Sequence, residues 1–211
     1  MLTLALMGFT SFFSVLGFII PGFIEKYYFS PYRVYHNNEH YRFLSHAFIH
    51  AGFLHLGLNM LAFYSFGIVL EEIYFPELYG YKLGKVMYLL LFTGSIYASS
   101  LLELFLYKNR ERYASLGISG TVSAVIFAFI IISPLSEIYF FFFPLKGWIA
   151  GILILGISFY LIRKKRKGEY HDPISHESHY CGALFGVMFM LITRPSLGLS
   201  FIKTILGSLG V

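Results

Sequence analysis

Ser119 is the side chain with the clearest potential for chemistry, because it stands between two glycines at the start of an apolar run. The stretch 116–129 reads L-G-I-S-G-T-V-S-A-V-I-F-A-F, and glycines such as Gly117 and Gly120 allow sharp turns that leave backbone N–H groups uncovered. A hydroxyl beside the unpaired N–H groups of a helix start could act as a nucleophile with an oxyanion site. The alternative is a small-residue patch that packs two membrane helices, with Ser119 only as the helix start.

A second residue, His179, could supply the base that a serine nucleophile needs at neutral pH. It begins the sequence H-Y-C-G-A-L-F-G. Small residues recur at intervals of four in both stretches: Gly120, Ala124 and Ala128 in one, and Ser178, Gly182 and Gly186 in the other. Such faces allow two helices to approach closely, which would bring Ser119 within hydrogen-bond range of His179. Packing alone would also account for the small residues, and both interpretations can hold together.

His55 and Asn59 are four residues apart, so on a helix they share one face. Both side chains can donate hydrogen bonds, which suits an oxyanion hole that stabilises a tetrahedral intermediate. A pair of this kind is also typical of a polar contact that holds membrane helices together, and that alternative remains open at this point.

The composition predicts an integral membrane protein. Of the 211 residues, 57% are hydrophobic and only 13% are charged, with a mean hydropathy of +0.68, whereas a soluble domain carries about 25% charged residues. The net charge of +5 comes from basic residues in short loops, so we expect contact with lipid headgroups and no binding of nucleic acid. Cys181 is the single cysteine, which excludes a disulfide within the chain.

The apolar stretches predict a single all-α domain over residues 1–211, a bundle of six transmembrane helices. The predicted spans are 2–23, 53–71, 85–107, 117–133, 146–162 and 178–193, and a crossing takes about 20 residues. Spans two, four and six begin on the same side of the membrane, which places His55, Ser119 and His179 at one depth. Polar groups at that depth are costly in a bilayer and indicate function.

The remaining segments give further expectations. The first apolar run has no basic region before it and no clear cleavage site, so we expect a retained span. Residues 25–52 should form an ordered substructure at the interface. Residues 138–145 are apolar but too short to cross, which favours a buried loop or a re-entrant piece. Residues 197–211 favour an interfacial tail, and Glu103 is a charge near the end of the third span.

The three short motifs, taken together, resemble those of a rhomboid intramembrane serine protease. G-I-S-G, H-L-G-L-N-M and H-Y-C-G-A-L-F-G stand at the starts of predicted spans four, two and six. The segment Y-R-F-L-S-H-A-F-I-H is similar to the membrane-embedded first loop of bacterial rhomboids. The resemblance covers spans two to six and the first loop, and it is to short bacterial rhomboids without a cytoplasmic domain.

The resemblance implies a catalytic dyad without a third acid, in which Ser119 is the nucleophile and His179 the general base. It implies that the backbone N–H of Ser119, with His55 and Asn59, stabilises the oxyanion, and that Gly117 shapes this pocket. Residues expected in structural roles near the site, the last three through helix packing, are Arg42, His46, His50, Glu71, Gly120, Gly182 and Gly186. The expected substrates are peptide bonds in or near transmembrane segments of membrane proteins, with no cofactor and no metal.

Two positions depart from the family pattern. Tyr41 stands where the family often has tryptophan, beside Arg42. Ser123 stands where many bacterial relatives have a tyrosine that packs on the catalytic histidine. The group that orients His179 is therefore left open, and the neighbouring Tyr180 is one candidate.

The expected location is the inner membrane of a bacterium, with several spans. Most bacterial rhomboids open their site to the outside, and the resemblance implies the same here. Most of the 16 lysines and arginines lie on the predicted site side, however, so the positive-inside rule favours a site that faces the cytoplasm.

Other functions compete with proteolysis. A metal site would need more ligands than His46, His50 and the histidines near 176–179 provide, since no H-E-x-x-H and no clear carboxylate or thiolate completes a set. A catalytically inactive rhomboid-like protein that binds membrane proteins is the main alternative, although inactive relatives usually lose the serine or the histidine. A transporter would more often show internal repeats, which are not evident here.

The choice of base between His176 and His179 depends on depth. His176 follows a polar run and is expected to be a solvated residue at the water boundary, before the helix begins. His179 lies about 4.5 Å deeper along a helix axis, where a close helix crossing can place it beside Ser119.

Overall fold

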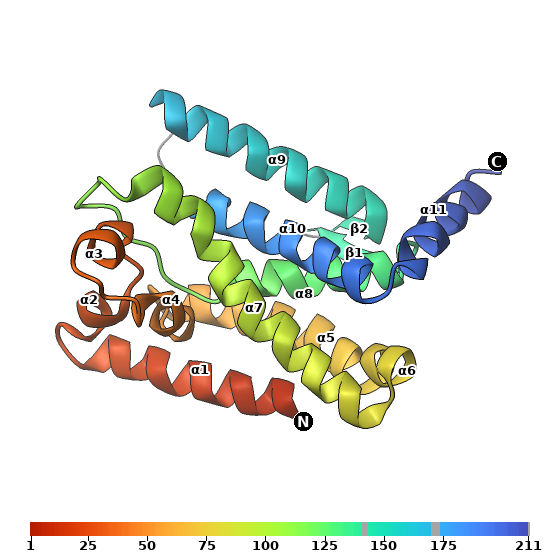
Figure 1. Ribbon diagram of the computed structural model, residues 1–211, viewed down its shortest axis with the longest axis horizontal. Helices are drawn as coiled ribbons and strands as arrows, with labels where there is room; N and C mark the ends of the chain where they lie inside the picture. Colours follow the sequence, from red (N-terminus) through yellow and green to blue (C-terminus); the bar gives the residue numbers. More distant parts are fainter. Residues whose placement is uncertain (141–142, 170–173, 211) are drawn as a thin grey trace.

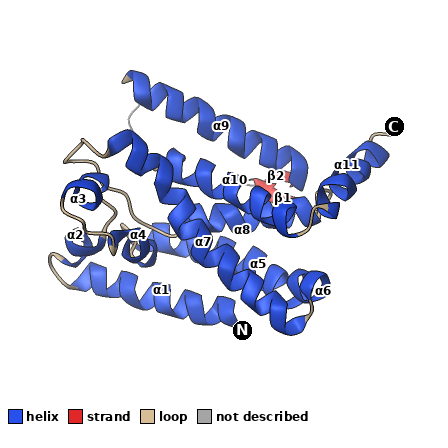
Figure 2. Cartoon of the chain, viewed as in Figure 1, coloured by secondary structure: helices blue, strands red, loops and turns tan. Residues whose placement is uncertain are grey.

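The computed structural model describes residues 1–140, 143–169 and 174–210, and it is a bundle of helices with a small hairpin (Figures 1 and 2). The longer helices are α1 (Leu2–Ile19), α5 (Phe53–Val69), α7 (Tyr81–Tyr107), α8 (Ser119–Ile132), α9 (Gly147–Lys167), α10 (His176–Thr193) and α11 (Ser196–Ser208). The shorter elements are α2 (Phe23–Tyr27), α3 (Pro31–His36), α4 (Arg42–Ser45), the 3-10 helix η1 (His46–Phe48), the π-helix η2 (Leu70–Tyr74), α6 (Phe75–Tyr79), β1 (Glu137–Phe140) and β2 (Phe143–Lys146).

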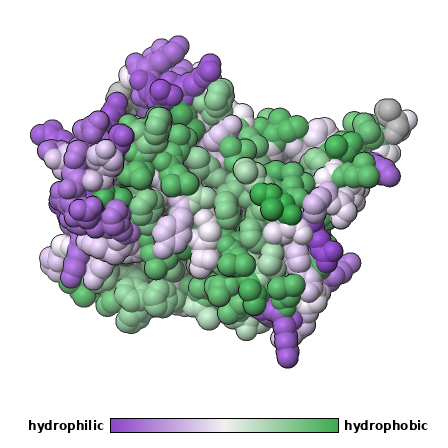
Figure 3. Space-filling model, viewed as in Figure 1, coloured by the Kyte–Doolittle hydropathy of each residue, from purple (hydrophilic) through white to green (hydrophobic). Residues whose placement is uncertain are grey.

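The surface is that of a membrane protein. In the view of Figure 3, a broad apolar region separates hydrophilic residues that gather toward the two ends of the long axis. Four helical segments are long and apolar enough to cross a bilayer: Leu2–Ile19, Phe53–Tyr79, Tyr81–Tyr107 and Gly147–Lys167. The bent pair α10–α11 is a fifth candidate if it counts as one span. The prediction of an all-α membrane bundle is confirmed. The predicted number of six spans remains a prediction, because α8, with 14 residues, is too short to count as a membrane span by its length.

Several helix ends differ from the predicted boundaries. The second span does not end at 71, because the chain stays helical through η2 to Tyr79. The fifth continues past 162 through the basic run to Lys167. Lysine and arginine are good helix formers and are favourable at a helix C-terminus, so charge did not end this helix. Gly168, at φ +76°, ends it instead in the left-handed region.

The segment after α8 corrects the prediction for 138–145. It is an antiparallel hairpin, with Glu137 opposite Lys146 and Ile138 opposite Leu145. Ile138 is buried, but the next residue, Tyr139, is 72% exposed, so the segment is not a buried loop. Alternation of inward and outward side chains is what a strand dictates. Residues 141–142, within the predicted loop, lie outside the described residues.

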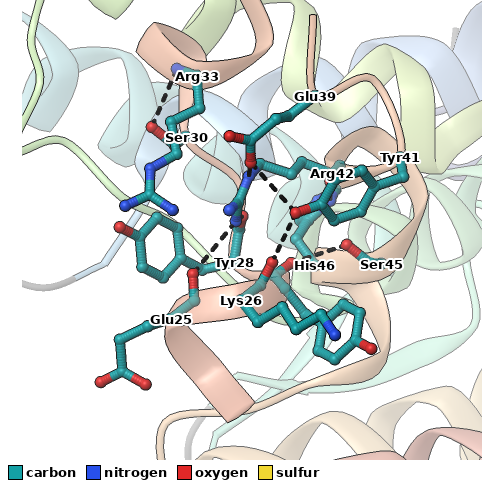
Figure 4. Close-up of polar contacts among 11 residues, drawn as sticks. Glu25, Lys26, Tyr28, Ser30, Arg33, Glu39, Tyr41, Arg42, Ser45 and His46 are labelled. Carbon is teal, nitrogen blue, oxygen red and sulfur yellow. Dashed lines mark hydrogen bonds and ion pairs between the residues drawn. The ribbon is translucent and has the colours of Figure 1, made fainter. Parts of the chain in front are cut away.

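Arg42 organises the first loop, which is ordered as predicted (Figure 4). Its side chain is 1% exposed; Nε donates to Glu39 at 2.6 Å, and Nη1 donates to the carbonyl of Tyr28 at 2.7 Å. The hydroxyl of Tyr41 donates to the carbonyl of Lys26 and to Glu39, each at 3.1 Å. Burial alone would raise the pKa of Glu39, but its bonds to the Arg42 guanidinium hold that pKa below its usual value.

Helix α8 lies in the interior of the bundle, packed against α5, α7 and α10. Ala124, Val125 and Ala128 on α8 are fully buried. The helix whose first residue is Ser119 is therefore held on several sides, and its N-terminus cannot move without displacing its neighbours.

Candidate active site

Ser119 and His179 meet where α8 and α10 begin. Ser119 is the first residue of α8, and His179 lies in the first turn of α10. The hydroxyl oxygen of Ser119 lies 2.8 Å from Nε2 of His179. For Nε2 to accept the hydroxyl proton, the neutral imidazole must carry its own proton on Nδ1. This is the arrangement that general-base activation of a serine requires.

The dyad depends on an unusually close crossing of α8 and α10. A Cβ built on Gly182 would lie 1.9 Å from the carbonyl oxygen of Gly120, and one on Gly186 would lie 2.2 Å from that of Ala124. On the facing helix, a Cβ on Gly120 would lie 2.5 Å from the hydroxyl of Ser178. Only hydrogen fits at these positions. The structure thus brings together the two small-residue faces seen in the sequence.

Gly117 shapes the approach to Ser119. Its φ is +108°, a region that side chains rarely adopt, and its N–H donates to the carbonyl of His46 at 2.9 Å. A Cβ here would lie 2.8 Å from Cε1 and 3.1 Å from Nε2 of His55. The His55 ring therefore lies directly against the chain that leads into the nucleophile.

His55 has a ring N–H beside this loop, and Asn59 follows it by four residues on α5. The N–H of Ala51 donates to Nδ1 of His55 at 3.5 Å, which places the ring proton on Nε2, the nitrogen that lies 3.1 Å from a Cβ built on Gly117. The side-chain amide of Asn59 donates one hydrogen to the carbonyl of His55 at 2.9 Å. An amide has a second hydrogen to donate, so the Asn59 side chain can still act as a donor after this bond is made.

His50 connects α1 to the nucleophile loop, a link that the sequence did not reveal. The N–H of Ile118, next to Ser119, donates to Nε2 of His50 at 3.5 Å. Because Nε2 of His50 accepts this bond, Nδ1 of His50 carries the ring proton and donates to the hydroxyl of Ser14 at 2.9 Å. Burial, with a contribution from His55, lowers the pKa of His50 to about 3, so the ring is neutral near pH 7.

His46 joins the first loop to the same place. Its Nδ1 donates to the carbonyl of Arg42 at 2.9 Å, and its Nε2 accepts from the hydroxyl of Ser100 at 3.2 Å. Burial lowers the pKa of His46 to about 4 despite its backbone hydrogen bonds. Its carbonyl accepts from the N–H of Gly117, so this histidine links the backbone of Arg42 to the loop before Ser119.

The placement of Glu71 near the site is wrong. It lies 16 residues after His55 in one continuous helical segment, about 24 Å along the axis at 1.5 Å per residue. Its carboxylate accepts from the backbone N–H groups of Leu2 and Thr3, the latter at 2.7 Å, and pairs with Lys85 at 2.7 Å. Glu71 therefore stabilises the N-terminus of α1 at the opposite end of the bundle.

The neighbours of His179 correct one expectation. His176 is not a solvated loop residue: it is the first residue of α10 and is 7% exposed. The helix begins there because the Ser175 hydroxyl accepts from the N–H of Ser178 at 3.2 Å.

Ser123 donates to the carbonyl of Ser119 at 3.0 Å, and the ring of Tyr180 packs on Phe159. Within 1–140, 143–169 and 174–210, no group of three potential ligands could hold a metal.

Comparisons with known proteins agree with this architecture. The model of the rhomboid domain matches residues 37–196, most of the chain. Rhomboid protein 1, mitochondrial, from Saccharomyces cerevisiae is 37% identical over 110 residues, which are 49% of this chain. The match spans 29% of that relative's own length. The chain belongs to the rhomboid family.

Proposed function

We propose that this protein is an intramembrane serine protease that uses Ser119 and His179 as a dyad. The observation that carries the proposal is the 2.8 Å hydrogen bond between the Ser119 hydroxyl and Nε2 of His179. Membership of the rhomboid family supports an intramembrane protease. The expected substrates are transmembrane segments of other membrane proteins.

The first step would be acylation of Ser119. As its oxygen bonds to the scissile carbonyl carbon, its proton passes to Nε2 of His179. The tetrahedral intermediate then collapses, the C–N bond breaks, and the imidazolium gives the same proton to the leaving amine. In the second step, water attacks the ester with His179 again as base, which releases the acid and restores the serine.

The oxyanion would be held by the backbone N–H of Ser119 and the side chains of His55 and Asn59. The helix start at Ser119 supplies an N–H that α8 itself does not use. Because Nδ1 of His55 accepts from the N–H of Ala51, the ring proton is on Nε2, the nitrogen on the side of this region. Donors fixed in advance by packing need little rearrangement when charge develops.

A substrate helix must unwind locally before its carbonyl can reach Ser119, because the carbonyls of a helix are paired within it. Small or helix-breaking residues near the cut are therefore expected. We propose the inner membrane of a bacterium as the location.

The test is cleavage of generic transmembrane substrates by purified protein in proteoliposomes. Wild type should cut them, whereas Ser119→Ala and His179→Ala should be inactive while keeping the same thermal midpoint. Equal cleavage by wild type and Ser119→Ala would remove the protease assignment. Binding of the substrates without cleavage by any variant would favour the inactive, substrate-binding alternative.

A further inference from the structure

Glu103, near the end of α7, contacts both segments that lead to the dyad. It is 1% exposed. Its Oε2 accepts from the hydroxyl of Ser115 at 2.6 Å, and its Oε1 accepts from the hydroxyls of Ser175 and, at 3.0 Å, Tyr113. One carboxylate thus joins the loop before α8 to the start of α10.

Each serine stands four residues before one member of the dyad in the sequence: Ser115 before Ser119, and Ser175 before His179. Ser175 is the N-cap of α10, and its carbonyl accepts the N–H of His179 at 3.3 Å. Its orientation therefore sets where the helix that carries the base begins.

The loop side is equally constrained. Ser115 exchanges two backbone hydrogen bonds with Phe29, at 2.8 and 3.0 Å, so its backbone is fixed before Glu103 orients its side chain. One turn later on α7, Tyr107 repeats the bridging pattern. Its ring stacks on that of Tyr113 with centroids 3.9 Å apart, and its hydroxyl donates to Glu177 in the first turn of α10.

The carboxylate at 103 has no evident purpose in stability alone. A buried acid is costly in a membrane bundle, and an apolar side chain could fill the same space without that cost. Among the described residues, no lysine or arginine forms an ion pair with Glu103, and its partners are the three hydroxyls. Hydroxyl donors fix direction, which an apolar contact does not.

We propose that Glu103 is a positioning residue that sets the relative placement of Ser119 and His179 through Ser115 and Ser175. The part of this inference that concerns reaction rate rests on the proposed protease function. The part that concerns placement does not, since it follows from the hydrogen bonds alone.

Hydrogen exchange tests the placement independently of any activity. Glu103→Leu should raise exchange at least tenfold in both 113–119 and 174–179. Ser115→Ala should raise it mainly in the first segment, and Ser175→Ala mainly in the second. Tyr88→Phe is the matched control, because it removes another buried hydrogen bond of α7, to Thr3 at 2.8 Å, far from the dyad; it should change neither segment. If hydrogen exchange in the Glu103→Leu protein rises in only one of the two segments, or in neither, the proposal is overturned.

Kinetics test the consequence for catalysis. Glu103→Leu should lower kcat about 10- to 100-fold with KM changed less than about threefold, because small displacements of reacting groups are costly in rate. Glu103→Gln keeps an acceptor oxygen and should recover most of the lost kcat. In the Glu103→Leu background, Ser115→Ala should have no further effect, whereas Ser175→Ala should add only the loss of its cap on the N–H of Ser178.

The outcomes separate the two proposals. If wild type does not cleave but Glu103→Leu loosens both segments, the protease function fails and the positioning role stands. If wild type and Tyr88→Phe cleave and folded Glu103→Leu cleaves equally well, the positioning role fails. Should Glu103→Leu not fold, the two serine variants decide, because each should raise exchange mainly in its own segment. Unchanged exchange in both serine variants would overturn the proposal.

Discussion

The ring of His55 lies so close to Gly117 that a Cβ at that glycine would stand 2.8 Å from Cε1. Gly117→Ala must therefore displace the ring, and it also places a side chain at φ +108°. We expect a loss of about 10²-fold or more in kcat, because the proposed oxyanion donor His55 moves, with about 1–3 kcal/mol of destabilisation from backbone strain. The measurement is kcat with a thermal midpoint. Gly57→Ala, with no atom within 4 Å of the new methyl group, should leave kcat unchanged.

His179→Ala should abolish labelling of Ser119 by a fluorophosphonate probe, since labelling needs an activated hydroxyl. His176→Ala should be labelled at a rate within about threefold of wild type, because its ring lies 6.2 Å from that of His179 and the Ser119 hydroxyl contacts His179 instead. Gel fluorescence after timed labelling would show this. The reverse pattern would mean that His176 is the base.

Gly186→Ala should separate α8 from α10, because its methyl group would meet the carbonyl oxygen of Ala124 at 2.2 Å. A clash with backbone cannot be relieved by a rotamer change, so we expect at least about 1–3 kcal/mol of destabilisation and weak labelling of Ser119. Gly156→Ala on α9 meets no atom within 4 Å and is the control. Equal thermal midpoints for the two variants would contradict the close crossing.

Acid should destabilise the fold through His46. Burial lowers its pKa from 6.5 to about 4, so between these values the unfolded chain binds a proton that the folded chain does not. The free energy of unfolding should therefore fall as the pH drops from about 6.5 to 4, by up to about 3 kcal/mol from this residue. The check is the thermal midpoint across this range. His46→Gln should reduce the slope without abolishing it, because His50, with a pKa lowered to about 3, contributes in the same direction. The control His36→Gln, at an exposed position, should leave the slope unchanged.

The dyad could be predicted from the sequence because its geometry depends on regular features. Ser119 and His179 stand at starts of predicted spans of the same parity, and glycines at intervals of four allow their helices to meet. Both features can be recognised without knowing the conformation of any loop. The membrane bundle could likewise be predicted from the lengths of the apolar stretches.

The residues that support the dyad could not be predicted in this way. His50 contacts Ser14 and Ile118 through a loop conformation that no periodicity describes. Glu103 looked like a charge at the end of a span, because its partners lie in irregular segments. Glu71 was misplaced because the resemblance supplied a role for it without a position along the helix axis.

The 14 residues of α8 make a rod of about 21 Å, roughly 9 Å less than the hydrocarbon layer is thick. If the far end of α8 lies at one water surface, Ser119 at its other end lies inside the hydrocarbon layer of a bilayer of ordinary thickness. The lipid must thin around the bundle, or water must descend to the serine between the helices. The proposed hydrolysis would then respond to the acyl-chain length of the host membrane, so that lipid composition would act as a variable in the reaction.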